Sequence, residues 1–183
     1  MSRSKKLIVT ALFLIGACIL LYPAVSNKLA ERHQAEMISR YEQTVEELPK
    51  TDMKSEWEKA VKYNESVTGM SVEDPFILGS GSVLPGNYKD VLNVEEKEGV
   101  MGYIEIPAID VMLPIYHGVS ERVLRRGVGH METTALPIGG KGTHSVLASH
   151  RGLSTAKLFT DLDRIEGRGF VLYPMYLDPH LLT

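Results

Sequence analysis

The chain has 183 residues, of which 44% are hydrophobic and 23% are charged, and its formal net charge is −3. This length allows one modest hydrophobic core, and the near-neutral charge gives no general case for nucleic-acid binding. Because the chain has a single cysteine, Cys18, an intramolecular disulfide and a cysteine-rich metal site are excluded within it.

An uncharged apolar run at residues 7–25 is about as long as a bilayer requires. Arg3, Lys5 and Lys6 precede it, so the amino end is expected in the cytoplasm and the rest of the chain outside. The alternative is a cleaved signal peptide with a small-residue site at residues 24–26. The run exceeds most signal-peptide cores, which favours an uncleaved anchor. Both interpretations place the polar remainder outside the cytoplasm.

Two amphipathic helices are expected after the apolar run. The first reaches from Asn27 to about Leu48, and Pro49 breaks it. Thr51 or Asp52 can cap the second. The apolar stripe of the first comprises Ile38, Tyr41, Val45 and Leu48, and the second presents Met53, Trp57, Ala60, Val61 and Asn64. Both faces are expected to pack against the domain that follows, with a partner or membrane-surface contact as the alternative.

A loop and then short strands are expected in the middle of the chain. Residues 66–90 are rich in Gly, Ser, Pro and Asn, which is typical of a loop. Apolar β-type runs at residues 100–107 and 111–116 predict two strands. Residues 121–126 predict a helical turn, and residues 167–173 allow one further strand.

The segment 142–152 places a histidine in a turn that ends at a glycine. Residues 146–148 suit a buried strand, and His150 follows in a polar stretch. An imidazole at the end of a strand suits proton transfer near neutral pH. The ordinary alternative is a hydrogen-bonded surface histidine. Ser154 can cap a helix over residues 155–163.

Four segments follow one another in a characteristic order. They are GYIEIPAIDVMLPIYHG at residues 102–118, VLRRGVGHME at 123–132, LPIGGKGTHSVLASHRGL at 136–153 and AKLFTDL at 156–162. This succession resembles the sortases, the membrane-anchored cysteine transpeptidases of Gram-positive bacteria, in the form of class C, which polymerises pilins. The resemblance covers roughly residues 70–170. It implies a mainly β fold with N-terminal helices, in which a transmembrane helix precedes the first part of a sortase-type β-barrel.

The same resemblance suggests site residues. His150 corresponds to the family's catalytic histidine. Asp74, Pro75 and Phe76 resemble the Asp-Pro-aromatic motif of the class C lid, in which the aspartate approaches the catalytic arginine and the aromatic ring covers the cysteine. The alternative is a plain loop, because Asp before Pro commonly makes a turn.

The family's nucleophile has no counterpart in these residues. Sortases carry their cysteine well after the histidine and a catalytic arginine later still, whereas Cys18 lies in the apolar run and cannot meet His150 outside the membrane. Residues from about Pro174 depart from the family pattern, as a truncation would produce. We therefore expect a sortase that is inactive alone; the alternatives are a noncatalytic membrane-tethered peptide-binding fragment and half of a split enzyme.

Five regions are expected in the chain. These are a cytoplasmic basic end and transmembrane anchor at residues 1–26, a helical segment at 27–70, a lid-like loop at 71–98, a partial sortase β-barrel at 99–173 and a divergent tail at 174–183. The resemblance implies a cell-membrane protein facing the extracytoplasmic side. Its implied partner is the sorting-signal peptide of a pilin or surface protein.

The sequence offers two other candidate sites, a metal site and a serine nucleophile. Four histidines make a metal site conceivable, but their spacings form neither a helical i, i+4 pair nor a compact ligand motif, so no metal or cofactor is expected. These are His117, His130, His144 and His150. Ser149 beside His150 suggests a serine nucleophile, but adjacent strand side chains point to opposite faces and no nucleophile elbow is present.

Overall fold

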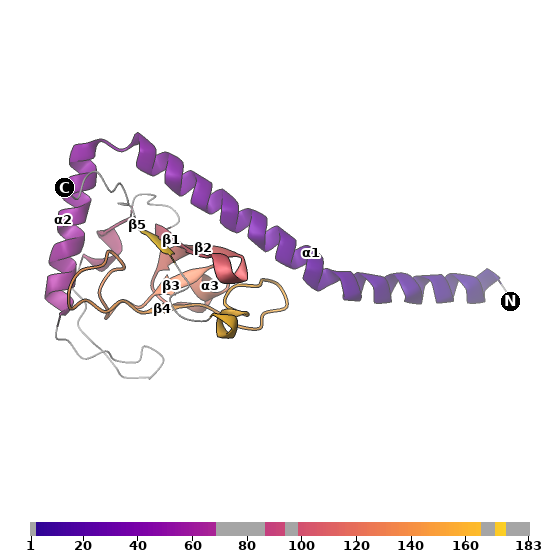
Figure 1. Ribbon diagram of the computed structural model, residues 1–183. Coiled ribbons are helices and arrows are strands. Elements are labelled where there is room, and N and C mark those ends of the chain that lie inside the picture. Colours follow the sequence, from indigo (N-terminus) through magenta and orange to yellow (C-terminus); the bar gives the residue numbers. More distant parts are fainter. Residues whose placement is uncertain (1–2, 69–86, 94–98, 166–170, 175–183) are drawn as a thin grey trace.

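The computed structural model describes residues 3–68, 87–93, 99–165 and 171–174. Figure 1 shows a small domain from which the first helix projects as a long arm, with the second helix on the side of the domain away from that arm. The expected lid residues Asp74, Pro75 and Phe76 lie outside the described residues.

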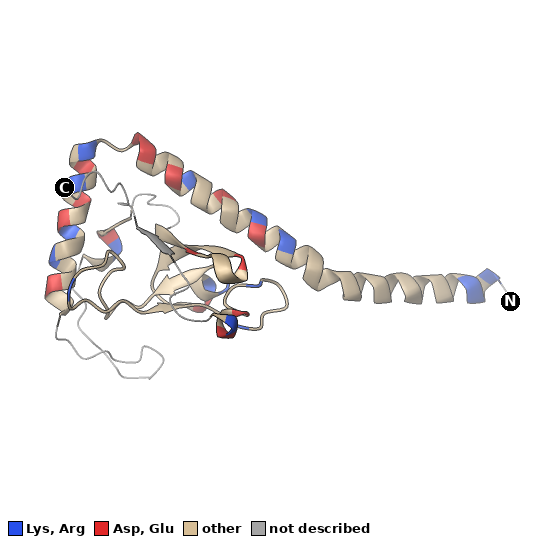
Figure 2. Cartoon of the chain, viewed as in Figure 1, with Lys and Arg blue, Asp and Glu red and all other residues tan. Residues whose placement is uncertain are grey.

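Helix α1 (Arg3–Glu47) is a single helix of 45 residues that contains the whole apolar run. It is long and apolar enough to cross a membrane, judged by length and composition. Figure 2 shows its outer arm without charged residues except for blue ones near the N-terminal end. Pro23 lies inside α1, and the ribbon bends where the arm meets the part that covers the domain, as expected where a proline removes a helical hydrogen bond. The anchor and the first amphipathic helix expected from the sequence are thus continuous.

The second half of α1 packs on the domain, as the apolar stripe predicts. Met37, Ile38 and Tyr41 are buried, and Val45 and Leu48 pack against the core. The hydroxyl of Tyr41 donates a hydrogen bond to the carbonyl oxygen of Met101 at 3.2 Å. Packing against the following domain, rather than contact with a partner, therefore explains this stripe.

Helix α2 (Lys50–Val67) begins one residue after Pro49. The expectation that Thr51 or Asp52 caps it is wrong, because Pro49 is the N-cap and no side chain caps the helix. The carbonyl oxygen of Pro49 accepts from the amides of Asp52 and Met53 at 3.0 and 3.1 Å. The buried residues of α2 are Ala60, Tyr63, Asn64 and Val67.

Five strands form one sheet in the described residues, in the order β4-β3-β2-β1-β5. They are β1 (Val100–Ile106), β2 (Val111–His117), β3 (Val128–His130), β4 (Leu147–Ala148) and β5 (Val171–Pro174). β2 and β3 are parallel, and the other neighbours are antiparallel. The short helix α3 (Glu121–Leu124) connects β2 to β3 and confirms the predicted helical turn. The predicted strands are confirmed as well, but β4 is half-buried rather than buried, and β3 was not predicted.

The helix expected over residues 155–163 is wrong. The structure has turns there, followed by the 3₁₀ helix η3 (Leu162–Arg164). Leu158 has φ of +43°, a value that L-residues rarely adopt and that no α-helix contains. The amide of Lys157 donates to Asn27 Oδ1 in α1 at 2.6 Å. A long-range contact with α1 thus holds this segment in a non-helical conformation, although its composition alone favours a helix.

A buried histidine joins the sheet to the segment that precedes β1. His130, at the end of β3, is fully buried; its Nε2 lies 2.9 Å from the carbonyl oxygen of Ala135 and its Nδ1 lies 3.0 Å from the hydroxyl of Tyr88. A carbonyl only accepts, so Nε2 carries the proton. The hydroxyl of Tyr88 donates its one proton toward both Nδ1 and the carbonyl oxygen of His130, which lies 3.1 Å from it. Burial lowers the pKa of His130 to about 4, which keeps the ring neutral.

This burial predicts a pH dependence of stability. The folded-state pKa of His130 lies near 4, below the unfolded value of about 6.5. The unfolded chain therefore binds more protons, and the free energy of unfolding should fall as pH drops from about 6.5 toward 4, by up to about 1.4 kcal/mol per pH unit.

Urea unfolding between those pH values measures this slope, which should flatten in His130→Gln. The matched control is His144→Gln, which replaces an exposed histidine without opening the core and should keep the slope. An unchanged slope in His130→Gln would contradict a neutral buried ring.

Candidate functional site

His150 lies two residues beyond β4, the edge strand of the sheet. β4 pairs with β3 through Gly129 opposite Ala148 and His130 opposite Leu147. The amide of Met131 donates to the carbonyl oxygen of Val146 at 2.9 Å and extends this pairing. The position of His150 therefore depends on β3.

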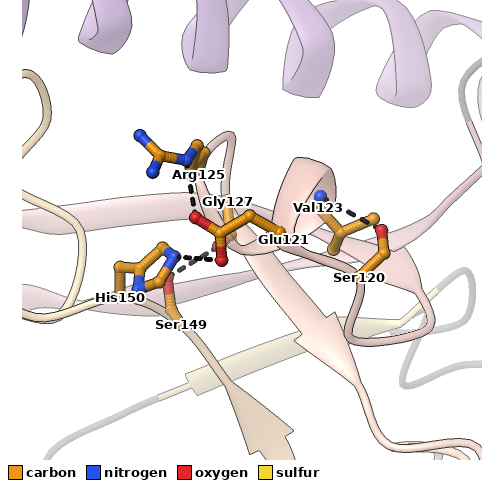
Figure 3. A network of polar contacts seen from close by, with 7 residues as sticks. All are labelled: Ser120, Glu121, Val123, Arg125, Gly127, Ser149 and His150. Carbon is orange, nitrogen blue, oxygen red and sulfur yellow. Dashed lines mark hydrogen bonds and ion pairs between the residues drawn. The ribbon is translucent and has the colours of Figure 1, made fainter.

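Ser149 fixes the backbone just before His150. Its hydroxyl donates to the carbonyl oxygen of Gly127 at 2.6 Å (Figure 3). Only glycine fits at position 127, because a Cβ there would lie 2.6 Å from the carbonyl oxygen of Pro114. Since the proton of Ser149 is directed to a backbone carbonyl, this hydroxyl is not placed as a nucleophile for His150.

The imidazole of His150 meets a carboxylate that the sequence did not single out. His150 Nε2 lies 3.1 Å from Glu121 Oε2, and Arg125 Nε donates to the other oxygen of Glu121 at 2.6 Å. Figure 3 shows Glu121 between the two basic side chains. Glu121 opens α3, and the hydroxyl of Ser120 caps that turn by accepting from the amide of Val123 at 3.4 Å.

The electrostatics of the group formed by His150, Glu121 and Arg125 follow from its geometry. The pKa of Glu121 is lowered, chiefly by the hydrogen bond from Arg125 and then by the contact with His150. The carboxylate is therefore ionised and can stabilise a protonated imidazole. The side chain of His150 is 30% exposed, so the ring also reaches solvent. With Nε2 directed at Glu121, Nδ1 is the ring nitrogen left to exchange a proton with a reacting group.

Two other histidines, His117 and His130, serve the fold. The ring nitrogens of His117 lie 3.0 and 2.8 Å from the carbonyl oxygens of Gly99 and Val91, and both nitrogens of His130 are engaged in the core. Among the residues that the structure describes, no group of three or more His, Cys, Asp or Glu side chains could hold a metal ion. Cys18 is exposed on the apolar arm of α1.

Comparison with known proteins gives a consistent answer. A family model described as the sortase domain matches residues 104–173. The crystal structure of Streptococcus pneumoniae sortase C matches with 35% identity and a TM-score of 0.66, covering 76% of this chain and 68% of that one. The chain belongs to the sortase family. No curated protein matches the chain.

Two further sortase C structures match. A lid mutant of Streptococcus agalactiae sortase C1 has 37% identity and a TM-score of 0.64, with 75% of this chain and 69% of that one covered. A pilus-related sortase C of group B Streptococcus has 29% identity and a TM-score of 0.61, with 74% and 68% covered. The expected resemblance to class C sortases and the expected fold class are confirmed, and the sortase-domain match contains His150 and Glu121.

The contacts of Glu121 predict how its pKa responds to substitution. Because the hydrogen bond from Arg125 is the largest cause of the lowered pKa, Arg125→Met should raise the pKa of Glu121 most, and His150→Gln should raise it less. Carboxyl ¹³C NMR as a function of pH measures both shifts.

The matched control is Arg122→Met, which removes an exposed positive charge from the same helical turn and should change this pKa least. A pKa of Glu121 that is the same in His150→Gln as in the parent chain would show that the two side chains do not meet in solution.

Proposed function

We propose that His150 is the acid–base residue of a class C sortase that joins pilin subunits. The observation that carries the proposal is the pairing of a partly exposed imidazole with the ionised carboxylate of Glu121, 3.1 Å apart, just beyond β4. The sortase-domain match that includes this position supports it. An imidazole so paired can hold a proton and remain open to a substrate.

The family reaction defines what such a histidine does. A cysteine thiolate attacks the threonine carbonyl of a sorting-signal peptide, and the bond to the next residue breaks as the leaving amine takes a proton from the imidazolium. A lysine amine of the next subunit then attacks the thioacyl carbon and loses its proton to the neutral imidazole. The thiolate leaves as the isopeptide bond forms, so His150 ends in its initial state.

The thiolate is the component that these 183 residues do not supply. Cys18, the only cysteine, lies on the arm of α1, which projects away from the domain that carries His150. We propose that the chain alone is inactive and that a segment carrying a cysteine and an arginine completes the site. The competing function is noncatalytic peptide binding at the membrane.

Asp74, Pro75 and Phe76 are proposed as a lid. The support is their Asp-Pro-aromatic pattern together with the likeness to sortase C1 of Streptococcus agalactiae, for which a lid mutant has been solved. In this proposal the lid closes the peptide groove until a sorting signal enters.

The chain is also proposed to be anchored by α1, with the domain outside the cell. Arg3, Lys5 and Lys6 precede the apolar run, which favours a cytoplasmic amino end. Protease added to intact cells should therefore digest the chain beyond about Ser26. Digestion only after the cells are opened would reverse the orientation.

A complementation assay tests the function of His150. The full chain should not join a sorting-signal peptide to an amine, and adding a sortase segment with the cysteine and arginine should produce that activity. His150→Ala should then lower the rate by about 10²- to 10⁴-fold, the usual contribution of a general acid–base group.

Two controls accompany this assay. His144→Ala and Cys18→Ala should leave the restored rate unchanged, because neither residue belongs to the proposed site. Peptide binding without any restored joining would favour the noncatalytic function. Joining by the chain alone, lost in His150→Ala, would require another nucleophile.

A further inference from the structure

The loop that follows His150 is held against α1 just beyond the apolar run. The hydroxyl of Ser26 donates to the carbonyl oxygen of Thr155 at 3.2 Å. The side chain of Asn27 accepts from the amide of Lys157 at 2.6 Å. Two adjacent residues of α1 thus bind two backbone groups of one loop. The loop adopts this bound conformation instead of the helix that the sequence predicts there.

The distance of this contact from the end of the apolar run follows from helix geometry. Ser26 and Asn27 come directly after the apolar run that ends at Val25. A helix rises about 1.5 Å per residue, so Asn27 lies only about 3 Å beyond the end of the run. The headgroup layer on each side of a bilayer is about 5–7 Å thick. A loop bound to these residues therefore lies at the level of the lipid headgroups.

We infer that residues 151–157, named here the headgroup loop, form a surface that contacts lipid headgroups. The inference rests on the proposed membrane anchor. Figure 1 shows the orange and gold segment that contains this loop as the part of the domain nearest the arm of α1, with α2 on the far side.

The headgroup loop is tied to His150 as well as to the anchor. The amide of Phe159 donates to the carbonyl oxygen of His150 at 3.2 Å, and the amide of Gly152 donates to Thr160 Oγ1 at 3.2 Å. His150 therefore directly precedes a loop whose distance from the membrane α1 sets.

Both charged side chains of the headgroup loop are paired. Arg151 pairs with Asp163 at 3.0 Å, and Lys157 lies 3.5 Å from Asp161, which also pairs with Arg164 at 3.3 Å. On α1, Lys28 pairs with Glu31 at 2.9 Å. A surface of paired charges suits zwitterionic headgroups as well as anionic ones. The contact is therefore set by the geometry of α1, and it should not depend on anionic lipid.

A spin label in the headgroup loop tests the inference on the full chain in lipid vesicles. Ser154→Cys and the control Glu58→Cys, exposed positions in the loop and in α2, are each made in Cys18→Ser. Nickel-chelating lipid in the outer headgroup layer should relax the label at position 154 strongly and the label at 58 weakly. The enhancement should be the same in phosphatidylcholine with and without phosphatidylglycerol.

A lifted variant supplies the second measurement. A seven-residue helical insert of Glu, Ala and Lys between Val25 and Ser26 raises the domain by about 10 Å and returns it to nearly the same rotation. Both partners of the Ser26 and Asn27 contacts move together, so the domain stays intact. The relaxation at position 154 should then be lost.

The outcomes separate this inference from the anchor. A chain that does not float with vesicles overturns the proposed anchor and the inference with it. A chain that floats but shows equal relaxation at positions 154 and 58 overturns the inference and leaves the anchor standing. A relaxation enhancement at position 154 that requires phosphatidylglycerol also overturns the inference and leaves the anchor standing. Charge, rather than the position that α1 sets, would then hold the loop at the membrane.

Discussion

The arrangement of the site depends on the burial of one neutral histidine. β3 has three residues, all buried, and the two-residue strand β4, which leads to His150, pairs with it. So short a pairing is marginal by itself. The ring of His130 adds hydrogen bonds to Tyr88 and Ala135, and the hydroxyl of Tyr88 also accepts from the amide of Gly118, after β2, at 3.0 Å. Because the ring stays neutral, this network holds the edge of the sheet without burying a charge.

Helix α1 imposes the second constraint. Its outer part is apolar and exposed, and its inner part buries Met37, Ile38 and Tyr41 in the domain. One continuous helix therefore belongs both to the proposed anchor and to the core, so the domain does not hang on a flexible linker. Gln34, also buried, donates to the carbonyl oxygen of Arg126 at 3.2 Å, which ties α1 to the turn between α3 and β3.

Local patterns in the sequence predicted most of the described fold. Apolar β-type runs located β1, β2 and β4, but β3 was not predicted. Apolar residues at three- and four-residue steps located the inward face of α1, because that period reports which side of a helix is buried. The helix expected over residues 155–163 was wrong because contacts with Ser26 and Asn27 override local propensity. The motif resemblance identified the family and suggested His150 as a site residue.

Glu121 was missed for a different reason. A Ser120 cap followed by Glu121 and Arg125 at i, i+4 indicates a helical turn, but it carries no information about a histidine 29 residues later in the chain. The two meet because α3 leads into β3 and β4 pairs with β3. Long-range proximity of this kind depends on sheet order, which no local pattern in one sequence specifies.

His130 and His150 lie in different environments, which favour a structural function for the first and the proposed acid–base function for the second. His130 has no exposed surface, so desolvation keeps it neutral and its hydrogen bonds organise the sheet. His150 is part of the same edge, but it keeps access to solvent and has an ionised carboxylate beside it. The ring of His150 is open to solvent, whereas the ring of His130 must break core contacts to accept a proton. Burial therefore assigns the structural function to His130, and the partly exposed pair with Glu121 supports the acid–base function proposed for His150.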